Sequence, residues 1–300
     1  MIIMITGANG QLGRALNGIL MKQSRNCVIN TDYVRGELPN QPLYPIEHLD
    51  ITEQNAVETF IEKAKPDVVI NCAAHTQVEK CEADVKNAVK INELGPYYLA
   101  VAAKKSGARL VQVSTDYVFD GEAGRPYVEE DITNPVSVYG KTKLAGELLV
   151  QKHCSQYFIV RTAWLYGDGN NFVKTMLRLS ETNQEIRVVK DQFGTPTSAY
   201  ELAKLILFLI ETEDYGIYHG TCEGSTSWYE FAKEIFKLSE REPVLIPVKS
   251  EEYPAKVKRP KYSVLENHRL NTTTDYRMKE WKEALRDYLD SLKNGGEQAE

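Results

Sequence analysis

The sequence predicts an α/β protein in which a doubly wound parallel sheet carries a smaller C-terminal lobe. Three observations support this prediction. An apolar run at the N-terminus leads directly into a turn that contains three glycines. Short apolar runs then alternate with helical patterns through the first half of the 300 residues. After Gly167 this alternation becomes looser, which indicates a change of architecture.

The N-terminal unit is an apolar strand over 2–6, a turn with Gly7, Gly10 and Gly13, and a helical pattern that reaches Leu20. In such a unit one glycine permits a tight turn, another lets a pyrophosphate approach the backbone, and a third lets helix and strand pack closely. The helix N-terminus adds free N–H groups and a partial positive charge. Glycine spacing alone is weak evidence, because surface turns are rich in glycine. The flanking strand and helix favour a dinucleotide site in a Rossmann-type fold.

Further strands and helices follow in alternation. The apolar runs predict strands at 27–31, 67–71, 108–114 and 157–161. The helical patterns predict helices at 52–64, 82–105 and 139–151. Thr52 is the expected N-cap of the first of these helices, and Gly95-Pro96 is expected to kink the second. Continuous apolar strands separated by helices indicate a parallel sheet that is covered on both faces, with right-handed crossovers.

The second half is predicted to form most of the lobe. Helical patterns occupy 171–181, 199–211, 227–238 and 277–293, with a short strand-like run at 186–189. We assign residues 1–167 to a dinucleotide-binding domain, with a return segment near 184–220. Residues 168–300 mainly form a substrate-binding lobe above the strand ends, where ligands bind in such folds.

Composition excludes several classes of protein. The apolar fraction of 42% can build a full core, and the net charge is −6. The densest basic patch, at 256–261, is too short to indicate nucleic-acid binding and is either a solvated loop or an anion clamp. No run reaches the ~20 apolar residues of a membrane span, and the short N-terminal run is not a signal peptide.

The five cysteines are scattered and lack the spacing of a metal site. They fit a reducing cytoplasm, with Cys27 and Cys72 expected as buried thiols in apolar runs.

Asp32 ends the second predicted strand, about 20 residues after the glycine turn, where a carboxylate can hold the adenosine ribose hydroxyls. A plain turn aspartate is the alternative, but the position within the strand–helix–strand unit favours the ribose. A carboxylate repels a 2′-phosphate and so favours NADH, whereas Arg14 and Arg35 are near enough in sequence to accept NADPH. The sequence leaves this choice open.

Tyr139 and Lys143 lie four residues apart in a predicted helix and therefore share one face, with a rise of about 6 Å. Such a pair is common on amphipathic helices, but here it follows a strand that ends at Thr115 in a dinucleotide fold. A carbonyl that receives a hydride needs a proton donor, and a phenol with a pKa near 10 is slow at neutral pH. A nearby ammonium stabilises the tyrosinate by up to about 4 kcal/mol at ~4 Å. Thr115 can donate a second hydrogen bond to the carbonyl oxygen.

Together these motifs resemble the extended short-chain dehydrogenase/reductase family and, within it, the group of dTDP-4-dehydrorhamnose reductases. The likeness covers nearly the whole chain. Its motifs are Gly7-x-x-Gly10-x-x-Gly13, Asn71–Glu79, Ser114–Phe119, Val138–Glu147, Arg161–Gly167, Asn170–Phe172, Asp191–Thr197, Arg259-Pro260 and Arg269–Asn271. Many ordered motifs are far more specific than any single one.

The resemblance implies that NADPH or NADH delivers a hydride to C4 of dTDP-4-dehydro-L-rhamnose, which gives dTDP-L-rhamnose for polysaccharide biosynthesis. Tyr139 would be the proton donor, and Lys143 would lower its pKa and hold the nicotinamide ribose. The implied cofactor-binding residues are Gly7, Gly10, Gln11, Leu12, Gly13, Asp32, Asp50, Ile51, Ala73, Ala74, His75, Tyr139 and Lys143. The implied sugar-binding residues are Thr115, Asp116 and Trp164. Arg259 is expected to pair with the substrate pyrophosphate, because planar bidentate contacts favour arginine.

Several alternatives stay open at this point. Trp164 can be a core residue, and Asp50 can cap a helix. His75 can contribute its backbone to the site rather than its imidazole. Related dehydratases carry a glutamate base where this chain has Tyr117, so dehydration is disfavoured. A different nucleotide-sugar 4-keto reductase, an epimerase, or a regulatory subunit like the beta subunit of methionine adenosyltransferase fits the same fold. A homodimer is a candidate assembly, and no metal site is predicted.

Overall fold

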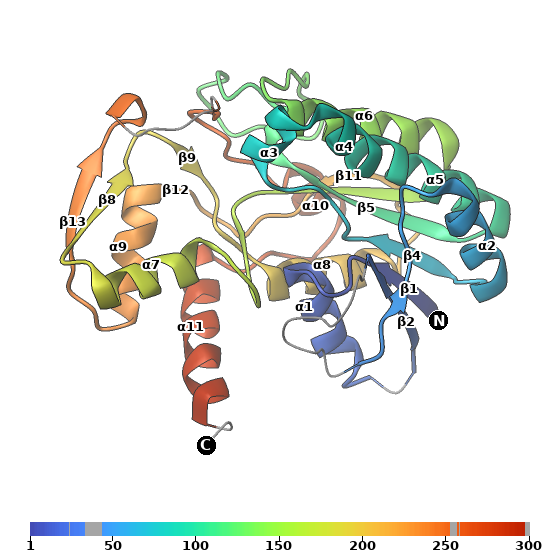
Figure 1. The fold of residues 1–300 in the computed structure, drawn as a ribbon, viewed down its shortest axis with the longest axis horizontal. Coiled ribbons are helices and arrows are strands. Elements are labelled where there is room, and N and C mark those ends of the chain that lie inside the picture. The colour runs from blue at the N-terminus through green and yellow to red at the C-terminus, as the bar shows by residue number, and fades with distance from the viewer. Residues whose placement is uncertain (24, 34–43, 253–256, 258, 298–300) are drawn as a thin grey trace.

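A seven-stranded parallel sheet organises the larger part of the chain (Figure 1). The computed structural model describes residues 1–23, 25–33, 44–252, 257 and 259–297. The sheet order is β11-β6-β5-β4-β1-β2-β3, and every pair in it is parallel. The strands are β1 (Ile2–Thr6), β2 (Cys27–Asp32), β3 (Glu47–His48), β4 (Val68–Asn71), β5 (Arg109–Thr115), β6 (Tyr157–Thr162) and β11 (Gly216–His219). The predicted doubly wound Rossmann-type fold is confirmed.

Helices cover both faces of this sheet, and each face has its own apolar core (Figure 1). One face packs against α1 (Gln11–Leu20) and α8 (Ala199–Leu209), whose leucines, such as Leu16 and Leu205, are fully buried. The other face packs against α2 (Gln54–Ala64), α5 (Gly95–Ser106) and α6 (Val138–His153). Burial on both faces explains why the strands read as continuous apolar runs.

A polar ladder crosses three strands near their carboxyl ends. Thr6 on β1 donates from Oγ1 to Asn71 Oδ1 on β4 at 2.6 Å, and Asn71 Nδ2 donates to Gln112 Oε1 on β5 at 2.7 Å. All three side chains are buried. Because buried polar groups need partners, this ladder fixes the edge of the sheet from which the site loops depart.

The helical stretch before β5 is segmented, so the predicted single helix over 82–105 is wrong. It contains α3 (Val78–Ala83), α4 (Val85–Val89), a π-helical turn at Lys90–Leu94, and α5. Asp84 separates α3 from α4, because its Oδ1 accepts the Asn87 N–H at 3.1 Å and caps a new helix. Pro96 has no N–H to continue an α-helical ladder, and the π-turn lies directly before it.

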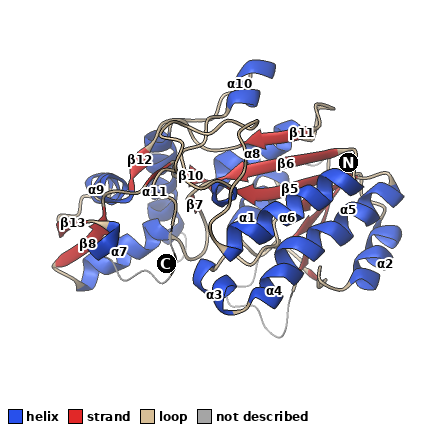
Figure 2. Cartoon of the chain, turned by 90° about the horizontal axis from the view of Figure 1, so that it is seen from above, coloured by secondary structure: helices blue, strands red, loops and turns tan. Residues whose placement is uncertain are grey.

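A smaller lobe lies at one end of the molecule (Figure 2). Its core is formed by α7 (Phe172–Thr182), α9 (Trp228–Leu238) and α11 (Trp281–Glu297), together with a parallel pair of β8 (Glu185–Val189) and β13 (Val244–Val248). The remaining short elements are the 3-10 turns at Asp116–Val118 and Ser250–Glu252, β7 (Leu165–Tyr166), β9 (Phe193–Gly194), β10 (Thr197–Ser198), β12 (Thr226–Ser227) and α10 (His268–Thr273).

The chain returns to the large sheet through α8 and β11, which pairs with β6. This return begins at Ala199 rather than near residue 184, because β8 pairs with β13 inside the lobe. The division of the chain into two domains at residue 167 stays a prediction.

Three further local predictions were wrong. Thr52 is not the N-cap of α2, which begins after Glu53 without a side-chain cap. Its hydroxyl instead donates to Asp50 Oδ1 at 2.7 Å, so Asp50 organises the preceding turn and does not cap the helix either. Cys27, the first residue of β2, is exposed, and Cys72 is only partly buried, so neither is the buried thiol that was expected. Each of the five cysteines is a free thiol. Within the described residues, no helix has the length and apolar character needed to cross a membrane.

Two glycines let α6 pack directly against neighbouring backbone. A Cβ at Gly140 would overlap the Tyr117 carbonyl oxygen, and one at Gly146 would overlap the Asn92 carbonyl oxygen. Both contacts involve main-chain atoms, which cannot rotate away as a side chain can. The position of α6 beside the π-turn and the end of β5 therefore depends on these two residues.

We expect Gly146→Ala to destabilise the fold by about 1–3 kcal/mol, because the added methyl group overpacks a backbone contact. Gly18→Ala is the matched control, since Gly18 is exposed on α1 and its Cβ would meet nothing within 4 Å. This control should gain about 1 kcal/mol from helix propensity. Thermal unfolding followed by circular dichroism measures both, and equal midpoints for the two variants would contradict the packing argument.

Candidate active site

The glycine turn after β1 has the backbone geometry that the sequence predicts. Gly7 has φ +65°, and a Cβ there would lie 2.6 Å from the Ala73 nitrogen. At Gly13 a Cβ would lie 2.5 Å from the Ala8 carbonyl oxygen, so this glycine permits close helix–loop packing. Gly10 is the N-cap of α1 and offers no side-chain cap to the first N–H groups of the helix. The turn is thus a backbone cradle that leads into a helix N-terminus.

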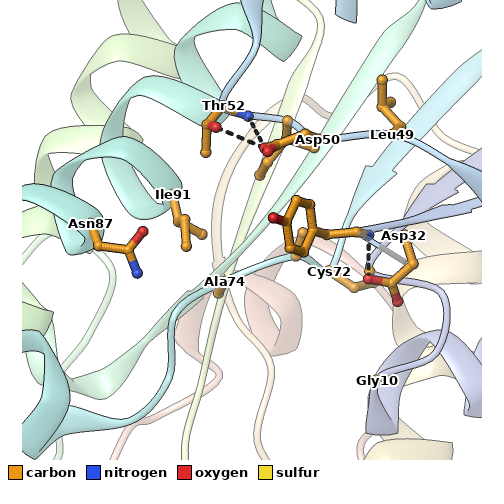
Figure 3. A pocket seen from close by; sticks show the side chains of 13 residues that line it. Gly10, Asp32, Leu49, Asp50, Thr52, Cys72, Ala74, Asn87 and Ile91 are labelled. Atoms are coloured by element: carbon orange, nitrogen blue, oxygen red, sulfur yellow. Dashed lines mark hydrogen bonds between the residues drawn. The ribbon is translucent and has the colours of Figure 1, made fainter. Parts of the chain in front are cut away.

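A cavity of about 420 Å³ opens beside this turn (Figure 3). Figure 3 shows Asn87 and Ile91 on the opposite side of the cavity from Asp32 and Gly10. The predicted cofactor residues that line it are Gly7, Gly10, Asp32, Asp50, Ile51, Ala73 and Ala74. The sequence analysis assigned no cofactor role to the remaining lining residues, which are Tyr33, Leu49, Thr52, Cys72, Asn87 and Ile91.

Asp32 is held by backbone at the rim of this cavity. Its Oδ2 accepts the Asn9 N–H at 2.9 Å, and its Oδ1 accepts the Tyr33 N–H at 2.7 Å. Arg14 lies close by, with Nη2 donating to Asn9 Oδ1 at 2.6 Å and Nη1 to Asp168 at 3.0 Å. A carboxylate and a guanidinium are therefore both linked to Asn9. Arg35, the other arginine considered for NADPH, lies outside the described residues.

Six predicted cofactor residues do not line the cavity with the others, and two of them, Tyr139 and Lys143, lie on α6 and are described below. Leu12 is buried in the core under α1, and Gly13 packs against Ala8. Gln11 lies beside Gly169, whose Cβ would approach the Gln11 Cγ to 3.3 Å. His75 is held through its backbone, as described next. Any contribution of these residues to a ligand stays a prediction.

Asn92, in the π-turn, is a positioning residue that the sequence analysis missed. Its Oδ1 accepts the His75 N–H at 2.8 Å, and its Nδ2 donates to the His75 carbonyl at 3.0 Å and to Thr142 Oγ1 at 3.3 Å. Asn92 thus joins the loop after β4 to α6. The only signal was a polar residue in an otherwise helical pattern before Gly95-Pro96, which is too common to identify this role.

Tyr139 and Lys143 lie one turn apart on α6, and both are buried. Ser137 caps the helix by accepting the Gly140 N–H at 3.1 Å, so Tyr139 is in its first turn. Lys143 Nζ donates to the Val113 carbonyl oxygen of β5 at 2.6 Å. Burial lowers the pKa of Lys143 to about 8, while the charges of Glu147 and Cys72 act to raise it.

The pKa of Tyr139 is raised above its ordinary value of 10, chiefly by burial. The side chain of Thr115 opposes this rise, and the charge of Asp116 adds to it. The structure therefore does not contain the lowered phenol pKa that the sequence analysis attributed to Lys143. The physical reason is that burial favours the neutral form of both groups, and the Lys143 amine is bound to a carbonyl of β5.

Thr115 ends β5, and Asp116 begins the turn that follows it. Thr115 Oγ1 donates to Asp116 Oδ1 at 2.9 Å and accepts the Tyr117 N–H at 3.2 Å. The ring of Tyr117 meets that of Tyr139 edge to face, with centroids 5.5 Å apart. The predicted catalytic threonine thus lies in contact with both the acid and the phenol of the site. Burial raises the pKa of Asp116 to about 6, while hydrogen bonds from Ser263 and Thr115 lower it.

Trp164 follows β6 and has a left-handed backbone, with φ +47°. Its indole stacks on Trp228 of α9, with centroids 3.5 Å apart and an interplanar angle of 7°. A Cβ at Gly194 would overlap this indole ring, so β9 also packs against it. Trp164 therefore packs on the lobe and is only partly buried, which leaves both its core and its sugar-binding interpretation in place.

Arg259 lies in the loop between β13 and α10 and contacts α3. Its Nη2 donates to Glu79 Oε1 of α3 at 2.8 Å, and this contact lowers the pKa of Glu79. The predicted pyrophosphate clamp is thus paired with a carboxylate that a phosphate would have to replace. Lys256 and Lys258 of the same basic patch lie outside the described residues. Among the described residues, no group of three or more His, Cys, Asp or Glu side chains is placed to hold a metal ion.

The doubly wound sheet and the placement of Tyr139 and Lys143 define a class, the extended short-chain dehydrogenases/reductases. The RmlD substrate binding domain family matches residues 1–294. A dTDP-4-dehydrorhamnose reductase of Aggregatibacter actinomycetemcomitans is 38% identical, over 95% of this chain and 97% of the relative. The crystal structure of a dTDP-4-dehydrorhamnose reductase from Clostridium acetobutylicum has 51% identity and a TM-score of 0.90, covering 98% and 100% of the two chains.

A third relative is the dTDP-4-dehydrorhamnose reductase of Bacillus anthracis, solved in complex with NADP. It has 40% identity and a TM-score of 0.86, and the match covers 97% of this chain and 99% of that one. The chain therefore belongs to the dTDP-4-dehydrorhamnose reductase family.

The raised pKa of Asp116 gives a stability prediction with a defined sign. The folded state holds a proton between about pH 4 and 6 that the unfolded state releases, so stability falls as the pH rises through this window. Asp116→Asn has no carboxyl group to titrate, so it avoids this loss of stability. We expect its stability relative to the parent to be about 2 kcal/mol more favourable at pH 7.5 than at pH 4. Chemical unfolding at the two pH values measures this difference.

Asp131→Asn is the control of opposite sign. The Arg125 side chain lowers the pKa of Asp131, so this carboxylate stabilises the fold at neutral pH and loses that effect in acid. The control should therefore lose more stability at pH 7.5 than at pH 4. A pH-independent effect of Asp116→Asn would show that its carboxyl group does not titrate as proposed.

Proposed function

We propose that this chain reduces the C4 keto group of dTDP-4-dehydro-L-rhamnose to give dTDP-L-rhamnose. The observation that carries the proposal is the continuity of the site. The cavity beside the glycine turn is lined by Ala73 and Ala74, and Asn92 hydrogen-bonds both His75 of the same loop and Thr142 of α6. Thr142 directly precedes Lys143 on that helix. From Lys143 the site continues along α6 to Tyr139, and from there to Thr115 at the end of β5.

The residues present fit a nicotinamide dinucleotide. A Cβ at Gly7 would overlap the Ala73 backbone, so the turn packs closely on the loop after β4. Gly10 leaves the first N–H groups of α1 without a side-chain cap, where a pyrophosphate would lie. Asp32 is placed for ribose hydroxyls, and Arg14 is linked to the same Asn9. A bound NADPH or NADH supplies the hydride. The Bacillus anthracis relative, solved with NADP, supports NADPH as the cofactor, whereas the Asp32 carboxylate favours NADH. Both cofactors therefore belong in the assay.

Tyr139 donates the phenolic proton to the C4 oxygen as negative charge develops on it. The raised pKa of Tyr139 keeps this proton in place before the reaction, so the donor is loaded across the neutral range. Thr115 holds the same oxygen through its hydroxyl, for which its proton must turn away from Asp116. Lys143 supplies an ammonium that stabilises the tyrosinate after transfer, and its buried position strengthens that attraction.

The groups that hold the sugar nucleotide come from the ends of β5 and β6 and from a loop of the lobe. Asp116 accepts hydrogen bonds from sugar hydroxyls, and the Trp164 indole offers an apolar face beside them. Arg259 binds the pyrophosphate bidentately once its contact with Glu79 is released. Replacing Glu79 by the pyrophosphate strengthens the electrostatic attraction to Arg259, because the pyrophosphate carries more negative charge than one glutamate.

The proposed reaction is tested directly by supplying enzymatically made dTDP-4-dehydro-L-rhamnose and following the loss of NADH and NADPH absorbance separately. Rapid oxidation of either cofactor, with dTDP-L-rhamnose identified as the product, is the expected result. The ratio of the two rates shows how Asp32 and Arg14 together set the preference. Cofactor binding without oxidation would overturn the assignment in favour of another keto-sugar or a regulatory role.

Tyr139→Phe should lower kcat by about 100-fold or more, because it removes the proton donor and leaves the ring in place. Cofactor affinity should change little. The matched control is Tyr117→Phe, since this partly buried phenol packs on Tyr139 without being assigned a role in proton transfer. Steady-state kinetics and cofactor fluorescence measure both effects. Equal turnover by Tyr139→Phe and the parent would remove Tyr139 from the proton-donor role.

A further inference from the structure

Helix α6 carries a third buried polar residue in line with the catalytic pair. Glu147 follows Lys143 by four residues, as Lys143 follows Tyr139, so the three side chains share one face of the helix. Glu147 is fully buried, with 0% exposure. A carboxylate without water around it needs a fixed partner to stay ionised.

That partner is Arg161 of β6, which is itself only 3% exposed. Its Nη2 donates to Glu147 Oε2 at 2.8 Å, and its Nε lies 3.1 Å from Oε1 and 3.2 Å from Oε2. The guanidinium also lies over the Phe119 ring, with Cζ 5.2 Å from the centroid. This fork-to-fork arrangement fixes the carboxylate geometry and holds it in the charged form.

The pair lies directly beside the catalytic edge of the sheet. In the β5–β6 register, Arg161 is opposite Ser114, the residue before Thr115. A buried ion pair contributes little net stability compared with apolar residues of similar volume, because removing both charges from water is costly. Stability alone is therefore a poor explanation for an ion pair at this place.

Lys143 is the group that the Glu147 charge reaches. The Lys143 amine donates to the Val113 carbonyl of β5, and the Cys72 thiol after β4 also acts on its pKa. Tyr139 and Glu147 lie one turn before and one turn after Lys143 on α6. Arg161 of β6 is the ion-pair partner of Glu147, and its charge is not among those that shift the pKa of Lys143. Burial favours the uncharged amine, and Glu147 is the carboxylate that opposes this effect.

We propose that Glu147, fixed by Arg161, is a positioning residue whose negative charge keeps Lys143 in the ammonium form. The role rests on the proposed reductase function, in which that ammonium stabilises the Tyr139 tyrosinate. Glu147 acts through Lys143 and touches neither the cofactor nor the sugar. The buried ion pair thereby extends the site two helical turns along α6 from the proton donor.

The test uses the Lys143 titration in the free protein. Lysine labelled with ¹³C at Cε is followed by NMR, and the Lys143 signal is assigned by its loss in Lys143→Arg. In Glu147→Gln the midpoint should fall by about one pH unit, because a charge one helical turn away is removed. Glu147→Asp, which keeps the charge, should restore most of this shift. Glu147→Gln/Arg161→Gln removes both charges and guards against a folding failure caused by an unpaired arginine.

Glu201→Gln is the matched control. Glu201 is also a buried, ion-paired glutamate on a helix, since its Oε2 lies 2.6 Å from Lys204 Nζ on α8. This variant should leave the Lys143 midpoint unchanged. Thermal unfolding verifies that each variant is folded.

The activity readout is the pH profile of kcat. Because the ammonium is the active form, a lower Lys143 pKa should move the alkaline limb of the profile to lower pH by the same amount. Reduced kcat at every pH, with an unmoved limb and an unmoved NMR midpoint, would overturn the proposal and leave a purely structural ion pair. Failure of the parent to reduce the keto-sugar would overturn the proposed function alone, because the NMR titration needs neither substrate nor cofactor.

Discussion

The close contact between α6 and the backbone around it is the constraint on which the site depends. Gly140 and Gly146 remove the side chains that would otherwise hold α6 away from Tyr117 and Asn92. At this distance the helix can bury Lys143 against a carbonyl of β5 and still present Tyr139 to the end of that strand. The sheet supplies a fixed edge, and the two glycines determine how near the helix comes to it.

Burial, more than the neighbouring charges, determines which protonation states the site residues favour. It favours the neutral forms of the Tyr139 phenol, the Lys143 amine and the Asp116 carboxyl. The neutral phenol suits a proton donor, whereas the neutral amine does not suit the stabilisation of a tyrosinate. A site of this kind needs a buried negative charge near the lysine, and Glu147 is in the place to provide it.

The sequence predicted the elements that depend on local pattern. The strand, glycine turn and helix at the N-terminus, the parallel sheet, and the shared face of Tyr139 and Lys143 follow from apolar periodicity and spacing alone. It did not predict the π-turn, the Asp84 cap, or the place where the chain returns to the sheet. Those features depend on tertiary partners: Asn92 on the His75 loop, and β8 on β13, where Glu185 pairs with Val244.

The side chains of the site were harder to place than its elements. A sequence pattern could identify Arg259 and Trp164 as candidates but could not show that one is paired with Glu79 and the other stacked on Trp228. That stacking has an optical consequence. Indoles stacked 3.5 Å apart perturb each other's electronic transitions, so separating Trp164 from Trp228 should change the near-ultraviolet circular dichroism of the protein. Because one indole follows β6 of the sheet and the other begins α9 of the lobe, the signal is an intrinsic reporter of whether sheet and lobe stay together.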